Sequence, residues 1–229
     1  MPDLPSENPE ALLHLFQLVS PALPVGAYAY SQGLETAIEN RWVKDFETAG
    51  DWIGNVMSHA IGQLDLPILL RLRKAWALND YQQVNDWNEF LIASRESKEL
   101  LLEDTQMGEA LHRLLMELNI PNADSWSSDD QPCFVTMFAL AADHWKISSA
   151  SMAHGFLWSW LENQVAAAVK LVPLGQTDAQ KLLILLMPKV NTVVGDSQNI
   201  EDADIGNNLP RLAIASMQHE VQYSRLFRS

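Results

Sequence analysis

Apolar residues recur at helical spacing along most of this 229-residue chain. In the stretch from Glu96 to Leu118 they follow a period close to 3.6 residues, at Leu100, Met107, Leu111, Leu114, Leu115 and Leu118. We find no convincing alternation of the kind that indicates strands, and no internal repeat. The pattern predicts an all-α fold, a single-domain helical bundle of about ten helices that spans residues 1–229.

Capping and helix-breaking residues set the expected helix boundaries. Asn8 before Pro9 forms a helix start, for example, and Pro121 forms a stop. The helix predicted over 150–171 is apolar on every side, which is typical of a helix at the centre of a bundle. We expect residues 1–8 to form a flexible N-terminus. The predicted helices cover residues 9–19, 31–40, 45–62, 65–78, 80–94, 96–118, 132–144, 150–171 and 179–187. Pro188 is expected to interrupt the last of these. Further helix is expected after it to about residue 200, and again over 209–218.

The segment 20–35 interrupts the helical pattern with two prolines, two glycines and two tyrosines. Pro21 and Pro24 fix φ and remove N–H donors, so no regular helix runs through them. Ser31 can cap a helix that begins near it, and Glu35 then lies favourably in the first turns. A recognition role for the whole loop is at least as well supported as a purely structural one, because binding residues concentrate on loops held by a rigid scaffold.

Two common catalytic loops are excluded for this segment. A phosphate-binding loop needs G-x-x-x-x-G-K-[ST], but Gly26 and Gly33 have the wrong spacing and no lysine follows. A nucleophile elbow needs G-x-S-x-G, and Ala29 stands where its first glycine belongs ahead of Ser31.

The carboxyl-terminal segment 219–229 is unusual because it mixes apolar and cationic residues in an acidic protein. Tyr, Phe and Arg are enriched at interfaces. Burying two apolar side chains there would yield about 1.5–3 kcal/mol each, whereas ordering the segment costs about 10–20 kcal/mol of backbone entropy. Additional hydrogen bonds and charge pairs must therefore come from the body of the protein or from a partner. The alternative is a terminal helix that frays at its last residues.

Composition narrows the class of protein. The formal net charge is −14 and the pI is about 4.7, which argues against nucleic-acid binding and fits basic protein partners or plain solubility. Cys133 is the only cysteine, which suggests a reducing compartment. The first residues lack the pattern of a signal peptide, and the most apolar stretch is too interrupted for a membrane span. We expect a cytoplasmic protein with no membrane contact.

Metal-binding and catalytic patterns are weak. The six histidines include no pair at i, i+4, and His154 is expected to be a hydrogen-bonded core residue. His219 is the most exposed candidate, and it is only a weak candidate for a metal ligand. The acidic run 201–204 does not fit a calcium loop, and Cys133 is expected to be a buried structural thiol. No catalytic residue is predicted, so we expect a protein that is not an enzyme.

Four segments carry a family resemblance. The loop 20–35, the stretch from Trp160 to Thr177, the run Ser216-Met217-Gln218-His219-Glu220 and the ending Gln222–Ser229 resemble the UreF family of urease accessory proteins. The resemblance extends over about residues 10 to 229, in order. Residues 119–132 fall outside the matched segments and are expected to form a variable loop.

This resemblance implies an all-α, non-enzymatic adaptor in nickel-dependent urease maturation. It would join a UreD/UreH-type accessory protein and the GTPase UreG, act on apo-urease through their complex, and form a homodimer. Nickel would pass in transit, without a firmly bound cofactor. The implied partner-binding residues are Tyr30, Ser31, Gln32, Gly33 and Glu35 in the loop, and Gln222, Tyr223, Ser224, Arg225, Leu226, Phe227, Arg228 and Ser229 in the segment 219–229, which would become ordered against the UreD/UreH-type protein.

Two alternatives remain open at this point. One is a protein that activates or gates the GTP hydrolysis of the GTPase, with Arg41, Arg225 and Arg228 as candidates for an arginine finger. The other is a chaperone that itself binds nickel, with His219 as the residue to test.

Overall fold

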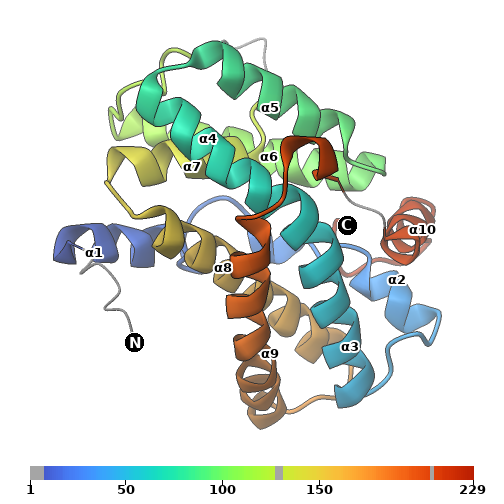
Figure 1. The fold of residues 1–229 in the computed structure, drawn as a ribbon. Helices are drawn as coiled ribbons and strands as arrows, with labels where there is room; N and C mark the ends of the chain where they lie inside the picture. Colours follow the sequence, from blue (N-terminus) through green and yellow to red (C-terminus); the bar gives the residue numbers. More distant parts are fainter. Residues whose placement is uncertain (1–7, 127–130, 207–208) are drawn as a thin grey trace.

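The computed structural model describes residues 8–126, 131–206 and 209–229, and within them every regular element is a helix (Figure 1). The predicted all-α fold is therefore confirmed. The expectation of a flexible N-terminus lies outside the described residues except for Asn8, which caps the first helix. The helices are α1 (Pro9–Leu18), α2 (Leu34–Glu39), α3 (Phe46–Val56), α4 (Leu66–Leu78), α5 (Tyr81–Ala93), α6 (Lys98–Glu117), α7 (Phe134–His144), α8 (Ser149–Leu171), α9 (Gln176–Ser197) and α10 (Pro210–His219), with the shorter segments η1 (Ala27–Ala29), η2 (Met57–Asp65) and η3 (Asp202–Asp204).

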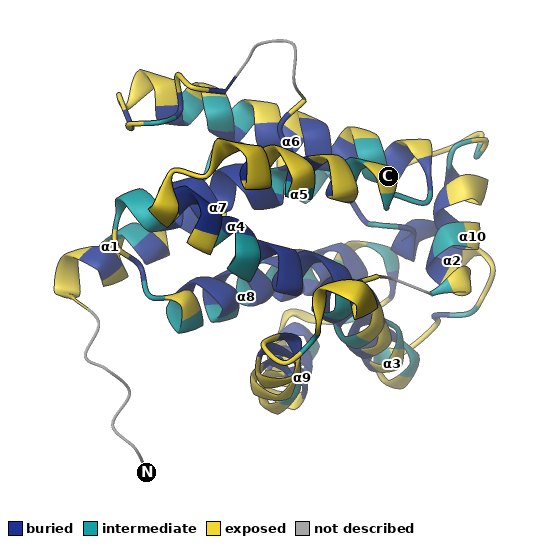
Figure 2. Ribbon diagram, turned by 45° about the horizontal axis from the view of Figure 1, so that its top comes forward, coloured by how far each residue is buried: buried dark blue, intermediate teal, exposed yellow. Residues whose placement is uncertain are grey.

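Helix α8 lies at the centre of the bundle, as its all-round apolar sequence predicts. It packs against α9, α4, α2, α3 and α1. A second group of helices, α4 to α7, packs together on one side of it. Figure 2 shows the buried surfaces of α4, α7 and α8 in the interior, while the exposed sides of α5 and α9 face solvent. One apolar core extends from Ala11 in α1 to Phe227 near the carboxyl end.

The two helices predicted over 45–62 and 65–78 form one continuous run. Helix α3 passes into the π-helical segment η2, which passes into α4 without a break. The wider turns of η2 end at Asp65, two residues before Pro67, which lies in the first turn of α4 and has no N–H to donate. Close packing also constrains η2, because a Cβ on Gly62 would lie 2.6 Å from the Val193 side chain of α9.

The predicted interruption at Pro188 is wrong. Helix α9 runs from Gln176 to Ser197 with this proline inside it. Buried residues on both sides, including Leu186 and Val190, attach the helix to the core. Pro188 and Ile184 lie on the exposed side, where the carbonyl that loses its helical hydrogen bond can reach water. Packing therefore outweighs the local preference.

The loop expected over 119–132 forms no helix in its described residues, 119–126 and 131–132. Its residues Ile120, Ala123 and Trp126 are nevertheless buried. The Ala123 carbonyl also lies 2.8 Å from the Nε2 of His112 on α6. The described part of this loop is thus packed onto the bundle.

Cys133 is fully buried, as expected of a structural thiol, and burial raises the pKa of that thiol. Within the described ranges, no helix is both long enough and apolar enough to cross a bilayer.

The contact between α6 and the segment before α7 gives a test of the packing. A Cβ on Gly108 would lie 1.9 Å from the Pro132 carbonyl oxygen, which is backbone and cannot rotate away. We expect Gly108→Ala to lower the free energy of unfolding by about 3 kcal/mol or more. Gly195→Ala is the matched control, because it is also helical and has no atom within 4 Å of its added Cβ. The control should raise stability by about 0.4–1 kcal/mol. Urea unfolding followed by circular dichroism measures both values, and equal effects would contradict this packing.

Candidate functional site

The loop before α2 has a backbone that only a few residue types tolerate. Gly33 has a φ of 75° and Gln32 one of 50°, both in the left-handed region. A Cβ on Gly33 would also lie 3.0 Å from the Cβ of Ala215, so α2 and α10 approach closely here. The predicted helix start near Ser31 is wrong, because these left-handed residues delay the helix to Leu34.

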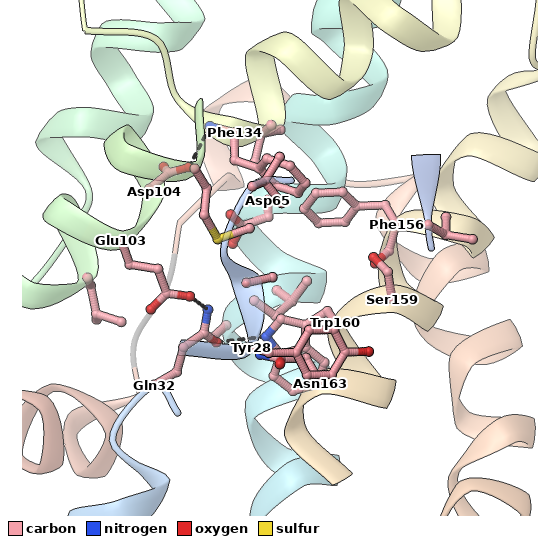
Figure 3. Close-up of a pocket in the computed structure, with 18 of the residues that line it drawn as sticks. Tyr28, Gln32, Asp65, Glu103, Asp104, Phe134, Phe156, Ser159, Trp160 and Asn163 are labelled. Atoms are coloured by element: carbon pink, nitrogen blue, oxygen red, sulfur yellow. Dashed lines mark hydrogen bonds between the residues drawn. The ribbon is translucent and has the colours of Figure 1, made fainter. Parts of the chain in front are cut away.

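The loop connects α6 to α8 through hydrogen bonds between polar side chains (Figure 3). The Gln32 Nε2 donates to the Glu103 carboxylate of α6 at 2.7 Å, and its Oε1 accepts from the Trp160 indole of α8 at 2.7 Å. The Tyr30 hydroxyl donates to Gln106 of α6 at 2.8 Å. Of the five loop residues predicted to bind a partner, four are buried and one is half-buried. Direct contact between them and a partner stays a prediction.

The carboxyl-terminal segment folds back onto this same loop. The Ser31 N–H and hydroxyl both donate to the main-chain oxygen of Ser229, at 2.8 and 2.6 Å. The Arg228 N–H donates to the Ala29 carbonyl at 2.8 Å. The two segments that the sequence marks as separate binding regions are therefore paired with each other, and the body of the protein supplies the hydrogen bonds that the segment 219–229 requires.

The Glu35 carboxylate holds this segment in place. Its Oε1 accepts from the Leu226 N–H at 2.7 Å, and its Oε2 accepts from the Phe227 N–H at 2.9 Å. The same Oε2 lies 3.2 Å from the Nε2 of His219 at the end of α10. Glu35 itself is almost fully buried. One side chain of α2 thus fixes α10 and the chain that follows it.

His219 is not exposed, contrary to the sequence-based expectation. Its side chain is fully buried, because α10 packs it between α2 and α6. Its Nδ1 lies 2.8 Å from the Glu99 carboxylate of α6, and its Nε2 faces Glu35. The Arg225 guanidinium also donates to Glu99, at 2.8 Å.

These contacts bear on metal binding. Among the described residues, no group of three His, Cys, Asp or Glu side chains is arranged to hold a metal ion. Both ring nitrogens of His219 are occupied by carboxylates, and Arg225 and the backbone N–H groups occupy those carboxylates in turn. A metal at His219 would have to displace these hydrogen bonds.

Glu103 forms a further contact between α6 and the carboxyl-terminal segment. Its Oε2 accepts from the Ser229 hydroxyl at 2.8 Å, and its Oε1 accepts from Gln32. Burial raises the pKa of this carboxyl to about 7, although the two donors act in the opposite direction.

The segment after α10 has an inner and an outer side. Phe227 is buried and carries the Lys170 ammonium 5.3 Å from its ring centroid. Tyr223 is fully exposed, and 64% of Leu226 remains accessible. The inner side therefore fixes the segment, whereas the outer side leaves large apolar side chains in contact with solvent.

A cavity of about 120 Å³ lies behind the loop, between α6, α8 and η2 (Figure 3). Its wall includes a buried ionic group in which Arg95 lies 2.6 Å from the Asp65 carboxylate and 2.7 Å from the Asp104 carboxylate. This space is large and polar enough to hold several water molecules. Tyr28 also lines it, and burial together with the neighbouring Glu162 raises the pKa of its hydroxyl to about 12.

Sequence reasoning missed Glu99 and Glu103. Both lie in the helix predicted over 96–118, where acidic residues would ordinarily face water. The available signal was their spacing, because residues four apart lie on one face of a helix. That signal cannot show that the face is covered by residues more than a hundred positions away.

Comparisons with known proteins agree over nearly the whole chain. A family model described as UreF matches residues 43–187. The chain is 53% identical over 218 residues to "Urease accessory protein UreF" of Teredinibacter turnerae, which covers 95% of this chain and 98% of the relative. It is 50% identical over 222 residues to the protein of that name from Hahella chejuensis, covering 96% and 99% of the two chains. It is 42% identical over 227 residues to "Urease accessory protein UreF 2" of Brucella anthropi, covering 99% and 100%.

The Glu35 contacts lead to a mutational test. Glu35→Ala removes the acceptor of two backbone N–H groups and the carboxylate that faces the His219 ring. We expect it to lower the free energy of unfolding by about 3 kcal/mol, because each buried donor left without an acceptor costs about 1–3 kcal/mol, and to expose the segment 219–229 to trypsin after Arg225. Glu39→Ala is the matched control, because Glu39 is exposed on the same helix and should change stability by less than about 0.5 kcal/mol. Equal trypsin resistance of the two variants would show that Glu35 does not hold the segment.

Proposed function

This chain belongs to the UreF family of urease accessory proteins, and we propose that within urease maturation it acts as a non-enzymatic adaptor. In this proposal it joins a UreD/UreH-type accessory protein and the GTPase UreG, and their complex delivers nickel to apo-urease. The side chains that could carry chemistry at the candidate site support an adaptor role, since they are engaged in structural hydrogen bonds. His219 is held by two carboxylates, and Glu35 is held by the backbone of the carboxyl-terminal segment.

The observation that carries the proposal is the two-sided carboxyl-terminal segment. Phe227 and Ser229 anchor it, while Tyr223, Leu226 and the half-exposed Arg225 remain available on its outer side. Tyrosine and arginine are over-represented among residues that dominate binding energy. A segment already ordered on its own body loses less entropy on binding than a free one. We assign this outer side to the UreD/UreH-type partner.

The homodimer and the GTPase contact need further surface. Two other sets of exposed apolar residues offer it, one on α1 and one on α9. The first comprises Leu12, Leu13 and Phe16, and the second comprises Ile184, Leu185 and Met187.

Regulation of GTP hydrolysis is the runner-up function. An arginine finger must be free to reach the transferring phosphate. Of the three candidate arginines, Arg225 already donates to Glu99, whereas Arg41 and Arg228 are exposed. GTP turnover by UreG with and without this protein distinguishes the two, because an adaptor leaves the rate of the isolated GTPase unchanged.

The outer side of the segment can be tested without unfolding the protein. We expect the double substitution Tyr223→Ala and Leu226→Ala to weaken binding to the UreD/UreH-type protein by 30-fold or more, about 2 kcal/mol. Both side chains are exposed, so helical circular dichroism should not change. Binding is measured by co-purification and by calorimetry.

The matched control for that experiment is Leu13→Ala, which removes an equally exposed apolar side chain on α1. It should leave binding to the UreD/UreH-type protein intact. If the double variant binds like wild type, the segment is not the contact, and if urease is fully activated in cells that lack this protein, the proposed function is wrong.

A further inference from the structure

The end of the carboxyl-terminal segment rests on a buried carboxyl group that has only neutral hydrogen-bond donors. Glu103 accepts from the Gln32 amide and from the Ser229 hydroxyl. Within the described residues, no lysine or arginine forms an ion pair with it, because the nearby Arg95 is held by Asp65 and Asp104. A buried carboxylate without a cationic partner is unstable relative to its protonated form.

From this geometry we propose that the carboxyl-terminal segment is a proton-linked latch, in which Glu103 takes up a proton when Ser229 docks and loses it when the segment leaves. The proposal goes beyond the adaptor role, since it concerns the isolated chain. The protonated carboxyl can still accept from Gln32, and it can donate to the Ser229 hydroxyl. When the segment leaves, Ser229 uncovers the carboxyl, and water can then stabilise its charged form.

The direction of the pH effect follows from burial. With the segment docked, burial raises the pKa of Glu103 from its ordinary value of 4.5 to about 7. Undocking exposes the carboxyl, so its pKa falls towards 4.5. At pH values between these two pKa values, the docked state therefore binds more protons than the undocked state. Docking weakens as the pH rises through about 7. Between pH 6 and pH 8 the docking equilibrium constant should fall about tenfold, because each pH unit below the docked pKa is worth a factor of ten.

Other charged groups surround Glu103 and the docked segment, and their effects on docking must be distinguished from that of Glu103. Asp104 on α6 raises the pKa of Glu103, and Arg95 lowers it. The other titratable or charged groups that face the segment from the elements packed against it include Glu35 on α2, Glu99 on α6, His219 at the end of α10, Asp65 at the end of η2, Tyr30 in the loop, and Arg225 and Arg228 in the segment itself.

Amide hydrogen exchange of Leu226 and Phe227 reports docking directly, since both N–H groups donate to Glu35 only in the docked state. We compare protection factors of the full-length protein at pH 6 and pH 8, corrected for intrinsic exchange, in wild type and in Glu103→Gln. The glutamine keeps both hydrogen bonds but cannot ionise. The wild-type protection should fall about tenfold more than that of the variant between the two pH values.

Glu109→Gln is the matched control, because Glu109 is exposed on the same helix, and it should follow the wild-type curve. Identical pH dependence in wild type and Glu103→Gln would overturn the proposal.

Ser229→Ala supplies a second test that does not depend on the folding of Glu103→Gln. It removes a donor that favours the charged carboxylate, so the fall in protection should move to higher pH. An unchanged midpoint would also overturn the latch. These measurements use the isolated chain, so a negative result would contradict the latch but not the adaptor proposal. A failure to bind the UreD/UreH-type partner would contradict the adaptor proposal but not the latch.

Discussion

The Glu35 carboxylate is the contact on which the organisation of this surface depends. It accepts from two successive backbone N–H groups and faces the His219 ring, so three elements meet at one buried side chain. Buried N–H groups without an acceptor are costly, and so is a buried carboxylate without donors. The Glu35 carboxylate and the backbone N–H groups of the segment therefore each need the other as a hydrogen-bond partner. The position of α10 and the path of the segment after it are consequences of this mutual requirement.

The same requirement explains why an acidic protein buries acidic residues at this end. Glu35, Glu99 and Glu103 line the place where the carboxyl-terminal segment docks. The segment brings donors of three kinds: backbone N–H groups, the Arg225 guanidinium and the Ser229 hydroxyl. A row of carboxylates on the body thus fits a donor-rich chain end. Arg225, a cation that looked out of place in the sequence, is the complement of acidic residues that only the fold brings together.

The fold could be predicted from the sequence because its signals are local. The 3.6-residue period predicted α6, the all-round apolar pattern predicted α8 at the centre, and Asn8 caps the helix expected to start after it. The errors arose where packing overrides a local rule. Pro188 stays inside α9 because buried residues flank it on both sides.

The candidate site could be predicted only in part, because its contacts are long-range. Both chain segments were identified as unusual, but nothing local shows that Ser31 bonds to a residue 198 positions away. For the same reason His219 could not be recognised as buried, since its two carboxylate partners are 120 and 184 positions distant.

The polar character of this docking has a consequence for partner binding. Among the large apolar side chains of the segment, Phe227 is buried while Tyr223 and Leu226 are exposed, so hydrogen bonds and charge pairs provide much of the attachment. Each such bond contributes only about 0.5–3 kcal/mol net, so the docked state is held by many small terms. A partner that binds the exposed side chains of the docked segment must stabilise that state, because binding and docking are linked. A partner that instead takes the segment away must replace the donors that Glu35, Glu99 and Glu103 lose, either with its own cationic groups or with water. The chemistry of this surface therefore restricts the ways in which it can be recognised.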